Sequence, residues 1–83
     1  MEQVVWVRAL DGYRIEVEFS DGLRGEVDIE PFLFGPMYEP LREPTFFEQV
    51  FVDSFGAVVW PNGADISAAG LHRRLRCELV GAV

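Results

Sequence analysis

Three residues in the segment 60–65 have side chains that could do chemistry together. Trp60, Asn62 and Asp65 place an aromatic ring, an amide and a carboxylate close in sequence, which could form a polar pocket or an edge that docks a partner. The same residues also suit a structural role. Asn62-Gly63 favours a turn, Asp65 can cap a following helix, and Trp60 can fill a core. We favour the structural role.

Metal and nucleophilic chemistry have few candidates, because His72 is the only histidine and Cys77 the only cysteine. Metal sites need three or four convergent ligands, and no HxxxH or CxxC spacing is present. Asp65 could align with His72 along a helix, but a solvated histidine fits the sequence better. On a helix, His72 and Cys77 would point about 140° apart. We therefore expect no enzyme, no metal and no cofactor.

Residues 72–76 form the one basic cluster of the chain. His72, Arg73 and Arg76 could contact a phosphate backbone or an acidic patch on a second copy of the chain. The alternative is a solvated helix face. The candidate binding residues are therefore these three together with Trp60, Asn62 and Asp65.

The composition indicates one small acidic domain spanning residues 1–83. The net charge is -7, and all seven basic residues are arginine. Such a surface should repel nucleic acid, so we expect a protein partner instead. A single cysteine fits a reducing cytoplasm, and no apolar run approaches the roughly 20 residues of a membrane span.

The elements that must position these residues begin with a hairpin. Apolar and polar residues alternate over 13–19 and again over 23–28, which predicts two strands with one buried face. A three-residue loop, Ser20-Asp21-Gly22, pairs Ile15 with Val27 and keeps both apolar rows on one side. Gly22 then occupies the left-handed position of the turn.

Residues 3–10 read as a further strand in front of this hairpin. A two-residue loop at Asp11-Gly12 would bury Arg8, whereas a three-residue loop turns Val5, Val7 and Ala9 inward. Because burial of an unpaired guanidinium is costly, we favour the second. Val4 and Trp6 would then lie outside and need cover from a helix or another subunit.

The remainder of the chain predicts an α+β fold. Short helices are expected over 29–34, begun by Asp28, and over 44–50, where Thr45 and Glu48 suggest a capping box. A second hairpin is expected over 50–53 and 57–60, apolar and covered on both sides. A C-terminal helix over 67–79 carries leucines at four-residue spacing, with Ser67 or Asp65 as its cap.

Together these segments resemble one bacterial family. They run in the order Tyr13-x-Ile15-x-Val17-x-Phe19-x-Asp21-Gly22, Val27-Asp28, Pro40-Leu41-Arg42-Glu43-Pro44 and Trp60-Pro61-Asn62-Gly63-Ala64-Asp65-Ile66. This order is similar to that of the domain of unknown function family numbered 2442. The resemblance implies a small α+β domain with a largely antiparallel sheet and without established catalytic residues. Members are often encoded beside a second small protein, in what looks like a toxin–antitoxin pair.

From charge and resemblance we expect a non-catalytic protein-binding module, the antitoxin-like partner in a two-gene pair. It would bind through an acidic sheet face or a sheet edge, and form a homodimer or larger assembly. One alternative is a transcriptional regulator whose C-terminal arginines contact nucleic acid. A weaker alternative is a small-molecule-binding protein or enzyme at residues 60–65.

Overall fold

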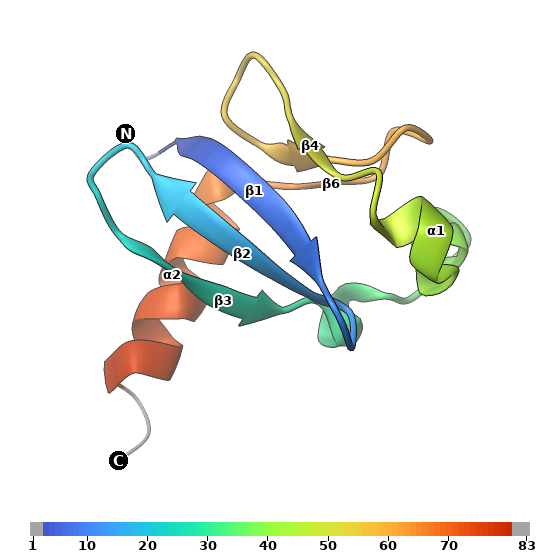
Figure 1. The fold of residues 1–83 in the computed structure, drawn as a ribbon, viewed down its shortest axis with the longest axis horizontal. Helices are drawn as coiled ribbons and strands as arrows, with labels where there is room; N and C mark the ends of the chain where they lie inside the picture. The colour runs from blue at the N-terminus through green and yellow to red at the C-terminus, as the bar shows by residue number, and fades with distance from the viewer. Residues whose placement is uncertain (1–2, 81–83) are drawn as a thin grey trace.

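Two small antiparallel sheets and a C-terminal helix make up an α+β fold (Figure 1). The computed structural model describes the backbone of residues 3–80 and the side chains of residues 3–75. No helix in this part of the chain is long and apolar enough to cross a membrane. The elements are β1 (Val4–Leu10), β2 (Arg14–Phe19), β3 (Arg24–Asp28), the 3-10 helices η1 (Glu30–Phe32) and η2 (Glu39–Arg42), α1 (Pro44–Phe47), β4 (Phe51–Val52), β5 (Val58–Val59), β6 (Asp65–Ile66) and α2 (Ala68–Val80).

The β2–β3 hairpin has the predicted register. Ile15 lies opposite Val27, and the N–H of Phe19 donates to the carbonyl of Leu23 at 2.8 Å, which closes a three-residue loop. Gly22 has a φ of 91°, in the left-handed region that glycine adopts without strain. On the inward side Ile15, Val17, Phe19 and Val27 are buried, so alternation placed this part of the core correctly.

The pairing of β1 with β2 is as predicted at one end and wrong at the other. Ala9 lies opposite Ile15, across a three-residue loop, and Arg8 lies on the polar side. Further back, a bulge between Val4 and Trp6 shifts the register. The extra residue turns Val4 inward, where it is 2% exposed, and leaves Val5 56% exposed. The prediction for these two residues is therefore reversed.

The second sheet contains the predicted hairpin and one strand more. Phe51 pairs with Val59 and Val52 with Val58, but β5 also pairs with β6, which sequence analysis missed. The hairpin is not covered on both sides. Val58 is buried on its inner side, whereas Phe51 is 45% exposed on the outer side. Side chains that alternate along a strand bury only one side of a hairpin, and this hairpin buries one side only.

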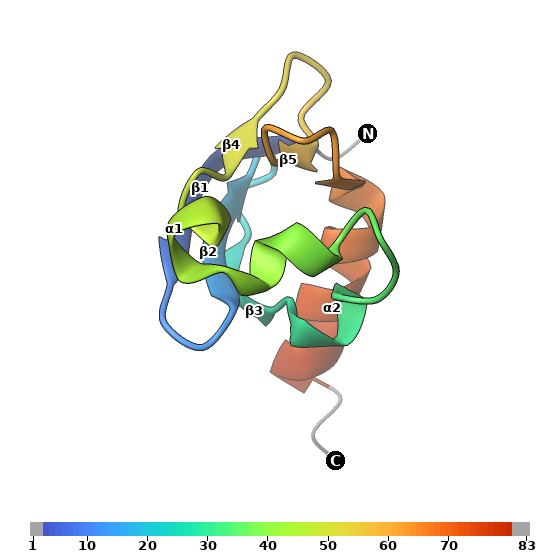
Figure 2. The same ribbon diagram turned by 90° about the vertical axis from the view of Figure 1, so that its right-hand side faces the viewer.

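The connection between the sheets runs across one end of the molecule as short helical turns (Figure 2). The carboxylate of Asp28 accepts the N–H of Glu30 at 3.0 Å, but the N-cap residue of η1 is Ile29, and the turn covers Glu30–Phe32 rather than the expected 29–34. The turn η2 was not predicted. The expected capping box is wrong, because Thr45 lies inside α1 and the N-cap residue is Glu43, whose side chain makes no capping bond.

Helix α2 packs against β3 and closes the core. Its N-terminus is capped by Ser67, whose hydroxyl accepts the N–H of Gly70 at 3.1 Å. Leu71 and Leu75 are buried, as their spacing predicted, while the Leu79 side chain lies outside the described residues. A Cβ on Gly25 would lie 2.7 Å from a Leu75 methyl group, so β3 and α2 approach closely at this glycine.

Candidate functional site

The segment 60–65 is a structural turn rather than a pocket. Trp60 is fully buried, and its indole N–H donates to the carbonyl of Phe47 at 3.0 Å. The amide of Asn62 accepts the N–H of Ala64 at 3.1 Å and donates to the carbonyl of Met37 at 2.9 Å. The Trp60 indole N–H and the oxygen and nitrogen of the Asn62 amide therefore all make hydrogen bonds within the fold. Core packing by Trp60 and the turn at Asn62 are therefore confirmed.

Asp65 does not cap the helix, contrary to one of the two expectations for it. It lies in β6 and is exposed, and its backbone carbonyl accepts the hydroxyl of Tyr38 at 2.9 Å. The strand delays the start of α2, so the cap falls on Ser67 instead.

His72 is buried, which contradicts the expectation of a solvated side chain. Only 6% of it is exposed, its Nε2 lies 2.8 Å from a carboxylate oxygen of Asp21, and its ring meets Phe19 edge-on at 4.8 Å. The N–H of Leu23 and the His72 ring hydrogen-bond the Asp21 carboxylate, and both lower its pKa. The pair fastens α2 to the β2–β3 loop. A ring enclosed in this way is closed to a substrate or a metal.

Two arginines of α2 have described side chains, Arg73 and Arg74. Arg73 is exposed, whereas the guanidinium of Arg74 lies 5.3 Å from the centre of the Phe32 ring. The side chain of Arg76 lies outside the described residues. Across the described residues, no group of three His, Cys, Asp or Glu side chains could hold a metal ion.

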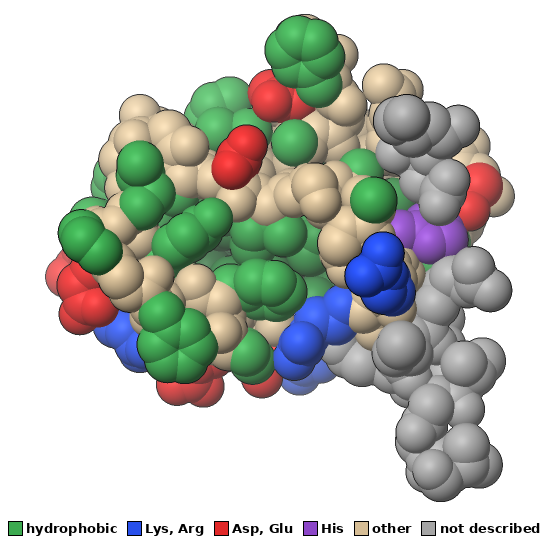
Figure 3. All heavy atoms as spheres, turned by 180° about the vertical axis from the view of Figure 1, so that it is seen from behind, with side chains coloured by type: hydrophobic (Ala, Val, Ile, Leu, Met, Phe, Trp, Pro, Cys, Tyr) green, Lys and Arg blue, Asp and Glu red, His purple; other side chains and the backbone are tan. Residues whose placement is uncertain are grey.

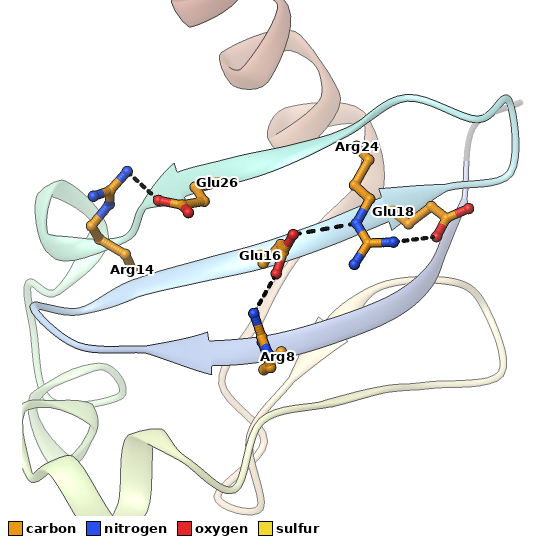
Figure 4. Close-up of polar contacts among 6 residues, drawn as sticks. All are labelled: Arg8, Arg14, Glu16, Glu18, Arg24 and Glu26. Atoms are coloured by element: carbon orange, nitrogen blue, oxygen red, sulfur yellow. Dashed lines mark hydrogen bonds and ion pairs between the residues drawn. The ribbon is translucent and has the colours of Figure 1, made fainter.

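The outer face of the first sheet carries a network of ion pairs (Figure 4). Glu16 lies at its centre, 2.8 Å from Arg8 and 3.3 Å from Arg24, and Arg24 also reaches Glu18 at 3.5 Å. A separate pair joins Arg14 to Glu26 at 2.6 Å. The three arginines of this face therefore pair with its three glutamates, although Glu16 also lies opposite Glu26 across β2 and β3.

Trp6 finds its cover on this same face. The Arg24 guanidinium lies 4.6 Å from the centre of its ring, and that of Arg8 lies 5.9 Å away. Cation–π contacts of this kind are worth roughly 0.5–1 kcal/mol at exposed sites. These guanidinium groups therefore cover part of the Trp6 ring.

A set of exposed apolar side chains lies where β1 meets the β4–β5 hairpin. We call it the apolar ridge; it consists of Val5, Phe51 and Phe55. Phe55, at the tip of the loop, is 81% exposed, and Figure 3 shows a hydrophobic side chain standing out at this tip. The loop below it is rigid, because the Asp53 carboxylate accepts the N–H groups of Phe55 and Ala57 at 2.8 and 2.9 Å.

A small cleft of about 240 Å³ lies at the far end of β1, between the β1–β2 loop and α1. It is lined by residues 10–13 together with Pro44, Phe47 and Glu48. None of the residues of the 60–65 segment lines this cleft.

Residues 4–76 match the family described as "Protein of unknown function (DUF2442)". The chain belongs to this family. No curated protein and no solved structure matches the chain. The family therefore supplies a relationship but no named activity.

In this DUF2442 protein, sequence analysis missed both surface features, the apolar ridge and the cleft. A signal for the ridge was present, because Phe55 is the middle residue of a three-residue loop, and such a side chain points away from the hairpin. The cleft had no comparable signal. Its two walls are more than 30 residues apart in sequence, and only the fold brings them together.

Proposed function

We propose that this DUF2442 protein is a non-catalytic protein-binding module of the cytoplasm that acts without a cofactor. The observation that carries the proposal is Phe55, an aromatic side chain 81% exposed on a rigid loop. Isolated exposed apolar residues are common, but aromatic anchors held on fixed backbones are typical of binding hot spots. Because the loop is already ordered, binding there would cost little conformational entropy.

The loop is also anchored from below. Gly56 accepts the N–H of Val4 at 2.9 Å, and the Gln3 amide donates to the Phe55 carbonyl at 3.5 Å. Val5 and Phe51 stand on the outward sides of the neighbouring strands, and Trp6 follows Val5 along β1. A partner with an apolar pocket for Phe55 could also contact the exposed Val5 and Phe51, and aromatic residues are enriched at interface cores.

The partner that we propose is the product of a neighbouring gene, with this chain as the antitoxin-like member of the pair. This step rests on the family resemblance. The net charge of -7 supports a basic partner, since opposite charges speed association. Assembly of two or more copies of the chain remains part of the proposal.

Co-expression with the neighbouring gene product, followed by affinity capture, tests the proposal. Phe55→Ser should weaken capture by roughly 30-fold, because a hot-spot residue contributes about 2 kcal/mol or more. The matched control is Phe34→Ser, which removes a phenylalanine 70% exposed outside the ridge and should leave capture unchanged. Equal capture by the wild type and Phe55→Ser, or no capture at all by the wild type, would refute it.

A further inference from the structure

The cleft between the β1–β2 loop and α1 has the size of a side-chain pocket. Its volume of about 240 Å³ lies below the roughly 300–1,000 Å³ of clefts that hold drug-sized ligands. Tyr13 and Phe47 give it an aromatic wall, with their rings edge-on at 5.7 Å. A single large side chain of a partner would occupy such a space.

Two carboxylates line the cleft from opposite walls, Asp11 from the loop and Glu48 from the end of α1. Both residues are exposed, and neither has an ion pair or side-chain hydrogen bond with any described side chain. The arginines closest in sequence are engaged elsewhere. Arg14 pairs with Glu26 at 2.6 Å, and Arg42 donates to the carbonyl of Leu33 at 3.1 Å. The cleft therefore keeps a local negative charge.

The walls are held in place before any ligand arrives. Tyr13 has a φ of 60°, unusual for a residue other than glycine. Its carbonyl accepts the N–H of Ile29 at 2.8 Å, and its hydroxyl donates to the carbonyl of Arg42 at 2.5 Å. These bonds join the loop to the segment in front of α1, so the fold holds the backbones of the two walls in place.

We infer that this cleft binds an arginine side chain presented by a protein partner, which deepens the proposed function and rests on it. A guanidinium group is planar, is less strongly hydrated than an ammonium group, and stacks on aromatic rings while it pairs with carboxylates. The cleft offers both kinds of contact. The net charge of -7 attracts a basic surface to it.

The probe is N-acetyl-arginine amide, with N-acetyl-citrulline amide as its uncharged isostere, titrated into ¹⁵N-labelled full-length protein. Arginine amide should shift the amide signals of Asp11, Gly12 and Glu48 in a saturable way, and citrulline amide should bind at least about tenfold more weakly. Equal shifts with both probes, or arginine-induced shifts spread over the whole surface, would overturn the inference.

The test variant combines Asp11→Asn with Glu48→Gln, and the control combines Glu30→Gln with Glu39→Gln. Each removes two negative charges from exposed positions, but only the first pair lines the cleft. The first should weaken arginine binding about tenfold, and the second should change it less than twofold. Equal weakening by both would mean that general acidity attracts the probe, and would overturn the site.

This experiment separates the two proposals. If Phe55→Ser abolishes partner capture while arginine amide fails to bind, the protein-binding function stands and the arginine site falls. If arginine amide binds at the cleft and no partner is captured, the site stands without the function assigned to it.

Discussion

Replacement of Gly56 by alanine should strain the junction between the two sheets and lower the stability of the fold. Gly56 has a φ of 80°, and an added Cβ would lie 2.5 Å from the Cβ of Gln3 and 3.0 Å from its Cα. Gly22 and Gly63 have φ values of 91° and 92°, but an added Cβ at either would meet nothing within 4 Å. They are matched controls for the backbone strain alone.

The expected magnitudes follow from these distances. An alanine at positive φ costs about 1–2 kcal/mol, and this is the whole expected effect of Gly22→Ala or Gly63→Ala. At Gly56 the clash with Gln3 adds about 1–3 kcal/mol of overpacking, because the backbone of Gln3 cannot rotate away. For a domain of this size, each kcal/mol lowers Tm by about 4–8 °C. The controls should therefore lose about 4–16 °C and Gly56→Ala about 8–40 °C.

Urea unfolding followed by tryptophan fluorescence gives the free energy of unfolding for each variant. Gln3→Gly in the Gly56→Ala background removes the closest atoms of the clash, so the double variant should recover about 1 kcal/mol relative to additivity. If Gly56→Ala destabilises no more than Gly22→Ala, or if Gln3→Gly recovers nothing, the contact between the N-terminal strand and the β4–β5 loop is not as described.

Two further predictions concern buried polar contacts. Trp60→Phe should destabilise by about 1–3 kcal/mol, measured by urea unfolding with circular dichroism, because it removes a buried hydrogen bond and leaves the Phe47 carbonyl only the N–H of Val50 at 3.4 Å; no loss would show that the indole hydrogen bond is unimportant. Since hydrogen bonds from the Leu23 N–H and from His72 lower the pKa of Asp21 below its usual 3.8, its carboxylate stabilises the fold above that pH and loses this effect as the pH falls through the folded pKa. Asp21→Asn should therefore be less stable than the wild type at pH 6 and approach it near pH 2, and a difference that stays constant with pH would contradict this.

Alternation and turn chemistry were sufficient to predict the β2–β3 hairpin, since the three-residue loop at Ser20–Gly22 leaves only one register with both apolar rows inside. They failed at β1, where the bulge exchanges the roles of Val4 and Val5 without any glycine or proline to mark it. The bulge lies where the edge of β1 meets β4, and contacts between these two strands are long-range in the sequence.

The candidate site shows the same limit. The turn role of Asn62 is local and was predictable, but the burial of His72 depends on a carboxylate that lies 51 residues away in the chain. The cleft likewise forms between segments that have no pattern in common. Local sequence patterns predict elements well, whereas pockets and buried polar pairs arise from how distant elements meet.

The inner face of the first sheet is covered by residues that follow it much later in the chain, and this has a consequence for protein synthesis. Strands β1–β3 are complete once residue 28 is made, but the buried side chains Trp60 and Leu71 that cover them come much later. At about 5–20 residues per second, the interval to residue 71 is roughly 2–9 s. Until then Ile15, Val17 and Phe19 lack the cover that they have in the finished protein, so a released fragment ending near residue 50 should bind a hydrophobic dye that the finished protein does not.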